Sequence, residues 1–176
     1  MAFEIYIPEA LTFQDYINVT QCARTLSDGY DRKDKERLQA CLAPSISVNY
    51  SSINPAWGVQ SFTREDFVTE WLGPQKLGVK ALGTQHLLGA PYFRSVTTEE
   101  IVVEWQQLAS HGRKVQSEDF ASPACRIGEE SDGRSYMLQT FLKIEGKWRI
   151  KEIKPELIYS TGDWKAVGRP DEDEKA

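Results

Sequence analysis

The spacing of apolar residues changes once along the chain, from a helical to an extended period, and this change limits the folds that are open to it. The following residues recur at helical spacing and predict a helix over about 12–30: Phe13, Tyr16, Ile17, Thr20, Ala23, Ser27 and Tyr30. A second, shorter helix is expected over 33–42, ended by Pro44. Thr63 has the character of an N-cap and predicts a third helix.

Extended patterns dominate the rest of the chain. The segment SISVNY alternates strictly and places Ile46, Val48 and Tyr50 on one face. Further strands are predicted over 83–88, 92–96, 100–110 and 134–144. The turn EGK leads into a last strand from Trp148, and only strands are expected after the third helix. Helices on one face of an antiparallel sheet form an α+β layer, and a strongly bent sheet around the long helix would enclose a cone with a pocket.

The chain has the length of one domain. Its 176 residues, 40% of them hydrophobic, are enough to fill one core or to line one cavity. We therefore expect a single domain over 1–176, with a core over about 11–164 and a solvated, charged tail over 168–176.

Charge and composition exclude several classes of function. A formal charge of −5 and a pI near 5.2 give no basic face for nucleic acid. No apolar run is long enough to span a membrane, and the N-terminus lacks the basic region of a signal peptide. Cys22, Cys41 and Cys125 lack the spacing of a disulfide framework or a zinc site. We expect a soluble protein in a reducing, cytoplasmic compartment.

Alternation also indicates which side chains line the predicted pocket. Three rows of residues each share one strand face: Ile101, Val103, Trp105, Gln107, Ala109 and His111; Thr84, His86 and Leu88; Ser135, Met137, Gln139 and Phe141. Polar side chains are few in these rows. The two histidines of the chain both occur in them, which makes them candidates for acid–base chemistry.

Several segments together resemble one known family. The pieces TFQDY, SDGYDRKDKERLQACLAPSISVNYSS, GTQHLLG, LASHGRK and RSYMLQTFLKIEGKWRIKEIKP are similar, in this order, to scytalone dehydratase and its fungal relatives. That family has the nuclear-transport-factor-2-like cone fold. The resemblance covers about 11–164, and it implies the same bent antiparallel sheet wrapped on N-terminal helices.

The resemblance implies a set of catalytic residues. In the family, two tyrosines hold a water against the substrate carbonyl and one histidine moves a proton, while an aspartate supports a second histidine; neither a metal nor an organic cofactor takes part. By position, the tyrosines are Tyr30 and Tyr50, and the proton-moving histidine is His86. The second histidine is His111, and its supporting aspartate is Asp31. Taken alone, Tyr30 and Tyr50 would also suit plain core packing, and Asp31 a helix-end surface.

The resemblance also implies a substrate pocket. Ser135 matches the family's pocket serine, but the family's asparagine two residues later is replaced here by Met137. Methionine offers a departing hydroxyl only a weak acceptor, whereas enolisation of a ketone does not need the amide. Met137, Trp105 and Phe141 are expected to form an apolar wall, and Trp164 either belongs to a lid or caps the core.

Three functions are compatible with these residues. The first is a cofactor-independent lyase that dehydrates a polyketide-derived hydroxy-ketone through enolisation. The second is an isomerase, cyclase or rearrangement enzyme that uses the same site, which Met137 favours. The third is a non-catalytic cone that binds a ligand or a partner. The expected partners are a small polyketide-type substrate and, from the resemblance, two further copies in a homotrimer built through the sheet.

Overall fold

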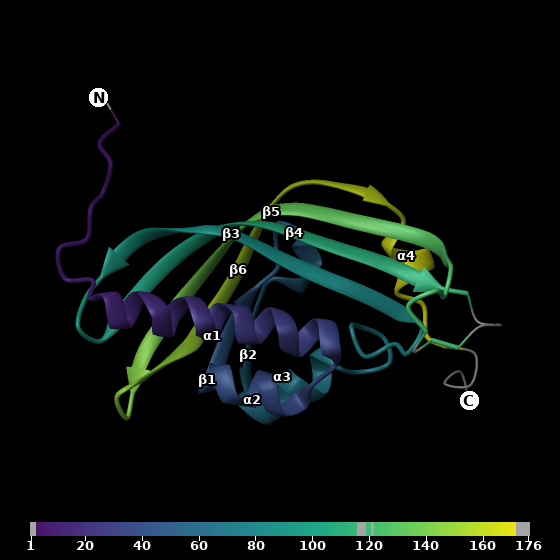
Figure 1. The fold of residues 1–176 in the computed structure, drawn as a ribbon, viewed down its shortest axis with the longest axis horizontal. Helices are drawn as coiled ribbons and strands as arrows, with labels where there is room; N and C mark the ends of the chain where they lie inside the picture. The colour runs from purple at the N-terminus through teal and green to yellow at the C-terminus, as the bar shows by residue number, and fades with distance from the viewer. Residues whose placement is uncertain (1–2, 116–118, 121, 172–176) are drawn as a thin grey trace.

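A computed structural model describes residues 3–115, 119–120 and 122–171 and shows helices under a long, curled sheet (Figure 1). The elements follow in this order: α1 (Phe13–Arg32), α2 (Lys35–Cys41), β1 (Leu42–Asn49), the 3₁₀ turn η1 (Pro55–Trp57), β2 (Val59–Thr63), α3 (Arg64–Trp71), β3 (Leu82–Val96), β4 (Glu100–Lys114), β5 (Ile127–Ile144), β6 (Lys147–Gly162) and α4 (Trp164–Val167). In Figure 1 the sheet arches over α1, α2 and α3. This arrangement confirms the predicted α+β cone.

The sheet has six strands in the order β2-β1-β6-β5-β4-β3. Its pairs are antiparallel except for β1 and β6, which run parallel. The prediction of an antiparallel sheet is therefore wrong at this pair. The chain leaves β1 through β2, α3 and three long strands before it returns as β6, so no hairpin constrains the relative direction of β1 and β6.

Helix α1 positions the end that carries Tyr30 and Asp31. It begins after Thr12, whose hydroxyl accepts a hydrogen bond from the backbone of Asp15, and it ends where Lys33 adopts a left-handed conformation with φ 54°. At Gly29, an added Cβ would lie 2.5 Å from Leu38 Cδ2. Glycine is needed there because α2 packs directly against the last turn of α1.

Several boundaries differ from the prediction. Thr63 is confirmed as the N-cap of α3, but β2 before it was not predicted, because its short sequence VQSFT is mostly exposed and shows no buried alternation. Strand β3 runs continuously through Pro91, which lies at a bulge, and β5 begins at Ile127. Helix α4 contradicts the expectation of strands alone after α3.

The C-terminal segment is fastened to the sheet by a buried ion pair. Arg113 on β4 donates to Asp171 Oδ1 at 2.7 Å and to the carbonyl oxygens of Val167 and Arg169. Asp171 is 2% exposed, so the predicted solvated tail over 168–176 is wrong at this residue. Its charge is tolerated inside because Arg113 neutralises it and because the backbone N–H groups of residues 80 and 81 donate to its second oxygen. The rest of the predicted tail, 172–176, lies outside the described residues.

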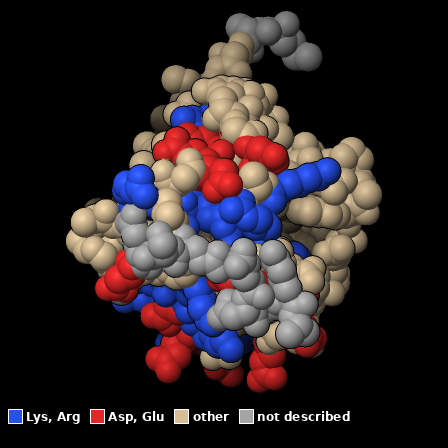
Figure 2. All heavy atoms as spheres, turned by 90° about the vertical axis from the view of Figure 1, so that its right-hand side faces the viewer, with Lys and Arg blue, Asp and Glu red and all other residues tan. Residues whose placement is uncertain are grey.

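The end of the molecule that carries α4 has a mixed surface. Figure 2 shows lysines and arginines beside aspartates and glutamates on this side. Such mixing gives this face no continuous basic surface for phosphates. Among the described residues, none of the helices has both the length and the apolar character needed to cross a bilayer.

Candidate active site

The strand registers place the two histidines on neighbouring rows of the concave face. Thr84, His111 and Ser131 lie side by side across β3, β4 and β5. The next row contains His86 on β3 opposite Ala109 on β4. The imidazole rings of His86 and His111 are 5.6 Å apart between centroids and meet edge to face. Alternation therefore predicted their shared face correctly.

Both carboxylate oxygens of Asp31 form hydrogen bonds with His86. Its Oδ1 lies 2.7 Å from His86 Nδ1, and its Oδ2 accepts the backbone N–H of His86 at 2.9 Å. A carboxylate only accepts, so His86 Nδ1 is the donor, and in the neutral ring Nε2 keeps its lone pair. The expectation that Asp31 supports His111 is wrong, because the last turn of α1 presents the carboxylate to β3 and both of its oxygens are used there.

His111 has a different set of neighbours. Its Nδ1 donates to the carbonyl oxygen of Ser131 at 3.0 Å, which leaves Nε2 unprotonated in the neutral ring. The indole of Trp164 on α4 packs against it, with ring centroids 4.9 Å apart. Burial, with the nearby His86 as a lesser cause, lowers the pKa of His111 to about 4. The ring is consequently uncharged at neutral pH.

This lowered pKa should make the free energy of unfolding depend on pH. Between about pH 4 and pH 6.5 the unfolded chain binds a proton at His111 that the folded chain does not. The contribution of neutral His111 to the free energy of unfolding is therefore fully present above about pH 6.5. It is lost as the pH drops towards 4, by up to ~3 kcal/mol. Urea unfolding at a series of pH values measures this loss. A His111→Asn variant should show a flatter profile; equal slopes in both proteins would contradict the assignment.

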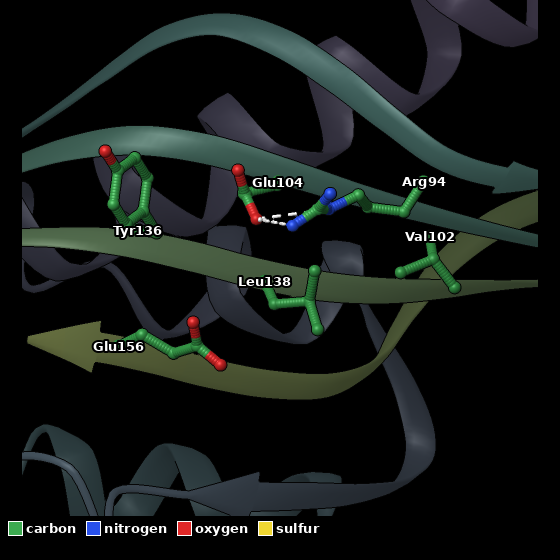
Figure 3. A pocket seen from close by; sticks show the side chains of 6 residues that line it. All are labelled: Arg94, Val102, Glu104, Tyr136, Leu138 and Glu156. Atoms are coloured by element: carbon green, nitrogen blue, oxygen red, sulfur yellow. Dashed lines mark hydrogen bonds and ion pairs between the residues drawn. The ribbon is translucent and has the colours of Figure 1, made fainter. Parts of the chain in front are cut away.

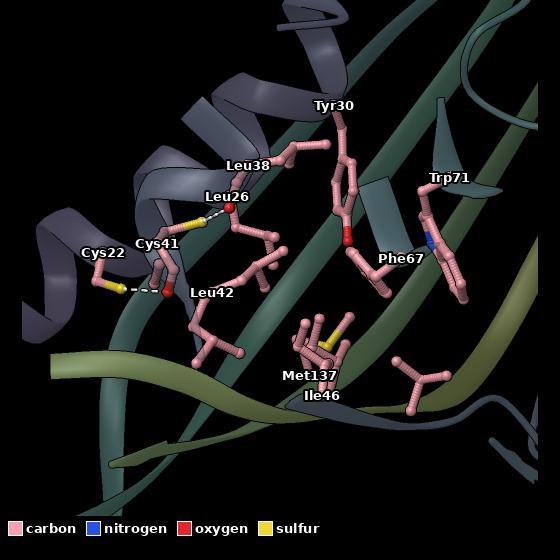
Figure 4. Packing of buried hydrophobic residues seen from close by; sticks show 14 of the residues in the cluster. Cys22, Leu26, Tyr30, Leu38, Cys41, Leu42, Ile46, Phe67, Trp71 and Met137 are labelled. Atoms are coloured by element: carbon pink, nitrogen blue, oxygen red, sulfur yellow. Dashed lines mark hydrogen bonds between the residues drawn. The ribbon is translucent and has the colours of Figure 1, made fainter. Parts of the chain in front are cut away.

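The two tyrosines provide neutral phenols. The Tyr30 ring lies 5.5 Å from that of His86, and Figure 4 shows its hydroxyl directed away from α1, towards Phe67 and Met137. Burial raises the pKa of Tyr30 well above its usual value and that of Tyr50 to about 12. Tyr50 follows β1 and packs on Trp71 of α3. Both phenols remain protonated at neutral pH and can donate to a substrate oxygen.

The predicted wall residues lie at different depths. Met137 and Trp105 are buried directly opposite each other on β5 and β4. Ser135 is also buried, and its hydroxyl donates to Gln107 Oε1 at 3.2 Å. Phe141 is fully buried two rows beyond Met137, so the structure places it in the core rather than beside the histidines. Trp164 packs against His111.

Four buried polar atoms on the concave side have no hydrogen-bond partner among the described residues. They are Tyr30 Oη, Thr84 Oγ1, Trp105 Nε1 and Gln139 Oε1. A buried polar atom left without a partner costs about 1–3 kcal/mol, so each of these atoms is a candidate contact for a polar molecule. Thr84, Gln107 and Gln139 were not predicted as site residues. Alternation did place these three side chains on the inward faces of their strands, and this pattern could have identified them as site residues.

The hollow of about 260 Å³ in Figure 3 is a separate feature on the opposite face of the sheet. Its lining residues Glu104 and Tyr136 alternate with the inward Trp105 and Met137. Arg94 is held there by Glu104 at 2.7 Å. No group of three or more potential metal ligands occurs among the residues that the structure describes.

Comparison with known proteins identifies relatives over nearly the whole chain. The family model for scytalone dehydratase matches residues 10–174. "Dehydratase cfoI" of Aspergillus candidus is 50% identical over 169 residues, covering 96% of this chain and 97% of that protein. The scytalone dehydratase of Pyricularia oryzae is 26% identical over 168 residues, covering 95% of this chain and 94% of the relative.

Solved structures share the fold. A putative scytalone dehydratase from Novosphingobium aromaticivorans superposes with a TM-score of 0.66 at 18% identity, covering 90% of this chain and 94% of that one. A type 2 hexachlorocyclohexane dehydrochlorinase superposes with a TM-score of 0.63 at 12% identity, covering 85% and 89% of the two chains. At these identities the likeness shows the cone architecture alone.

Proposed function

The chain belongs to the scytalone dehydratase family, and on this basis we propose that it dehydrates a polyketide-derived hydroxy-ketone by cofactor-independent acid–base catalysis. The observation that carries the proposal is the Asp31–His86 pair, packed against Tyr30 and His111 on the concave face. A mere binding cone does not require a carboxylate that fixes the tautomer of an inward histidine.

The chemistry begins at the substrate carbonyl. The neutral phenols of Tyr30 and Tyr50 donate hydrogen bonds to the carbonyl oxygen, directly or through a water, and so stabilise the charge of an enolate. His86 Nε2 takes the proton from the α-carbon, and the electron pair of that C–H bond enters the enolate. The Asp31 carboxylate stabilises the imidazolium that forms.

Loss of water completes the reaction. The enolate collapses to the ketone and forms a carbon–carbon double bond, while the bond from the β-carbon to its hydroxyl breaks. The departing hydroxide takes up the proton held by His86, so water leaves and the neutral histidine is restored. His111 is a poor proton donor for this step, because its pKa of about 4 keeps it unprotonated.

A second reaction class is favoured by Met137. It is a buried thioether where the family has an amide beside the leaving hydroxyl, and it cannot donate to a departing oxygen. The same enolate would then isomerise, cyclise or rearrange. Incubation of the purified protein with scytalone and related hydroxy-ketones, followed by mass spectrometry, separates the classes. Loss of one water supports dehydration, an unchanged mass in a new product supports isomerisation, and recovery of every ketone unchanged rejects both.

Trp164 should contribute to substrate retention. Its indole covers His111 from α4, and removal of the ring opens the site to water. We expect Trp164→Ala to lower kcat/KM by about tenfold, the upper range for one aromatic contact. Steady-state kinetics measures the effect. Trp164→Phe keeps an aromatic ring and should recover most of the loss; equal losses in the two variants would contradict a role for ring packing.

We further propose a homotrimer built through the outer face of the sheet. This face is apolar at Leu87, Leu108 and Tyr136, and Leu87 and Tyr136 are exposed. Contact between copies would cover these side chains. Light scattering should give three times the chain mass of 20.0 kDa, and Tyr136→Glu should shift the protein towards the monomer. A wild-type protein that is monomeric at micromolar concentration would refute this assembly.

A further inference from the structure

Two of the unpartnered polar atoms lie on β4 and β5, several rows away from the histidines. Trp105 is 3% exposed and Gln139 is 2% exposed, and neither Trp105 Nε1 nor Gln139 Oε1 has a hydrogen-bond partner among the described residues. Trp105 lies directly opposite Met137, and Gln139 is two residues further along β5 on the same face. At this diagonal spacing, long side chains on neighbouring strands come within reach of one another.

The chemistry of the two atoms is complementary. The indole N–H only donates, whereas the amide oxygen of Gln139 only accepts. A single hydroxyl group can accept from the first and donate to the second. Val103, Ile153 and Phe141 adjoin this pair on the same face and are fully or almost fully buried. The surroundings therefore suit a hydroxyl that is attached to an apolar ring.

The pair is distinct from the other polar groups of the concave face. Ser135 and Gln107 already bond to each other, and Thr84 lies beside His111 at the opposite end of the row order. His86 is opposite Ala109, four residues along β4 from Trp105, which corresponds to roughly 13 Å of extended strand. The pair is thus too far from His86 to take part in proton transfer.

We propose that Trp105 Nε1 and Gln139 Oε1 form a specificity subsite that binds a ring hydroxyl of the substrate, at the end remote from the carbon that loses its proton. The inference rests on the proposed function for its substrate class, a polyketide-derived hydroxy-ketone. The subsite selects substrates and holds them in register with His86.

Binding can be measured without turnover. The probes are 1-tetralone, a bicyclic ketone without a hydroxyl, and its 5-, 6-, 7- and 8-hydroxy derivatives. With wild-type protein, calorimetry should show at least one hydroxy isomer binding about tenfold or more tightly than 1-tetralone, as two neutral hydrogen bonds permit. Trp105→Phe and Gln139→Leu should each remove most of this preference and leave the affinity for 1-tetralone nearly unchanged.

The matched control is Gln106→Leu, which makes the same chemical change on the outer face of β4. It should retain the full hydroxyl preference. A wild-type protein that binds no hydroxy isomer more tightly than 1-tetralone overturns the proposal. So does a preference that survives in both Trp105→Phe and Gln139→Leu, which is the result expected if ordered water alone occupies the subsite.

A second measurement needs no substitution at the subsite. The indole N–H resonance of Trp105 in the wild-type protein should shift with the preferred hydroxytetralone and not with 1-tetralone; equal shifts with both would reject the subsite. The two proposals fail separately. Dehydration of a ketone with no hydroxyl preference removes the subsite alone, whereas a preference without any turnover of the ketones tested removes the proposed reaction alone.

Discussion

Replacement of His86 by alanine is expected to lower kcat by on the order of 10²–10⁴-fold, the usual contribution of a general base, while the protein stays folded. His86 Nε2 is the nitrogen left free to accept a proton, because Asp31 holds Nδ1 at 2.7 Å. Kinetics with the ketone that the mass assay identifies measures the loss, and circular dichroism checks the fold. Undiminished turnover by a folded His86→Ala protein would remove the base assignment.

The role of Asp31 follows from the same pair. Asp31→Asn removes the charge that stabilises the imidazolium and should lower kcat markedly. In the double variant with His86→Ala, the loss should be no greater than that in His86→Ala alone, because Asp31 acts through His86. Asp28→Asn is a matched control on the same helix, where Asp28 pairs with Arg24, and should leave kcat unchanged. Additive losses in the double variant would contradict the pairing.

From the sequence, the strand face of each site residue could be predicted, but the residue that it contacts could not. Period-two alternation places His86 and His111 each on the inward row of its own strand, and the structure agrees. It does not determine which histidine meets Asp31. That contact depends on how the last turn of α1 packs on β3, with Lys33 reaching the carbonyl oxygen of Leu82 at 2.7 Å. This packing is a tertiary contact, and the position of Asp31 in the helical pattern does not predict it.

Local composition was also misleading where a partner is distant in the sequence. The residues around Asp171 are polar and charged, so a solvated tail was the natural prediction. The partner Arg113 lies 58 positions earlier, two residues beyond the predicted inward row that ended at His111. The helix α4 between β6 and Asp171 has only four residues, too few for a periodic signal. The fold class was thus predictable from the sequence, whereas the packing of α4 and Asp171 against the sheet was not.

The buried Arg113–Asp171 pair should be one of the largest single contributions to stability. Asp171→Ala leaves the guanidinium of Arg113, whose side chain is 5% exposed, without its counter-charge. Breaking one side of a buried pair typically costs about 3–5 kcal/mol, and we expect a loss of this size in the free energy of unfolding. Urea denaturation measures it. The exposed pair of Arg169 with Glu129 provides the control, since Glu129→Gln should leave the free energy of unfolding nearly unchanged.

The double variant separates lost attraction from an uncompensated charge. If the cost of Asp171→Ala comes from the stranded guanidinium, then Arg113→Met combined with Asp171→Leu should be more stable than either single variant, because no buried charge remains. The carbonyl oxygens of Val167 and Arg169 would still lose their donor. Trp164 should then pack less firmly on His111, so kcat/KM should remain reduced after stability has recovered. A double variant as unstable as the sum of the single variants would show that the pair acts through its hydrogen bonds to residues 80, 81, 167 and 169 rather than through charge.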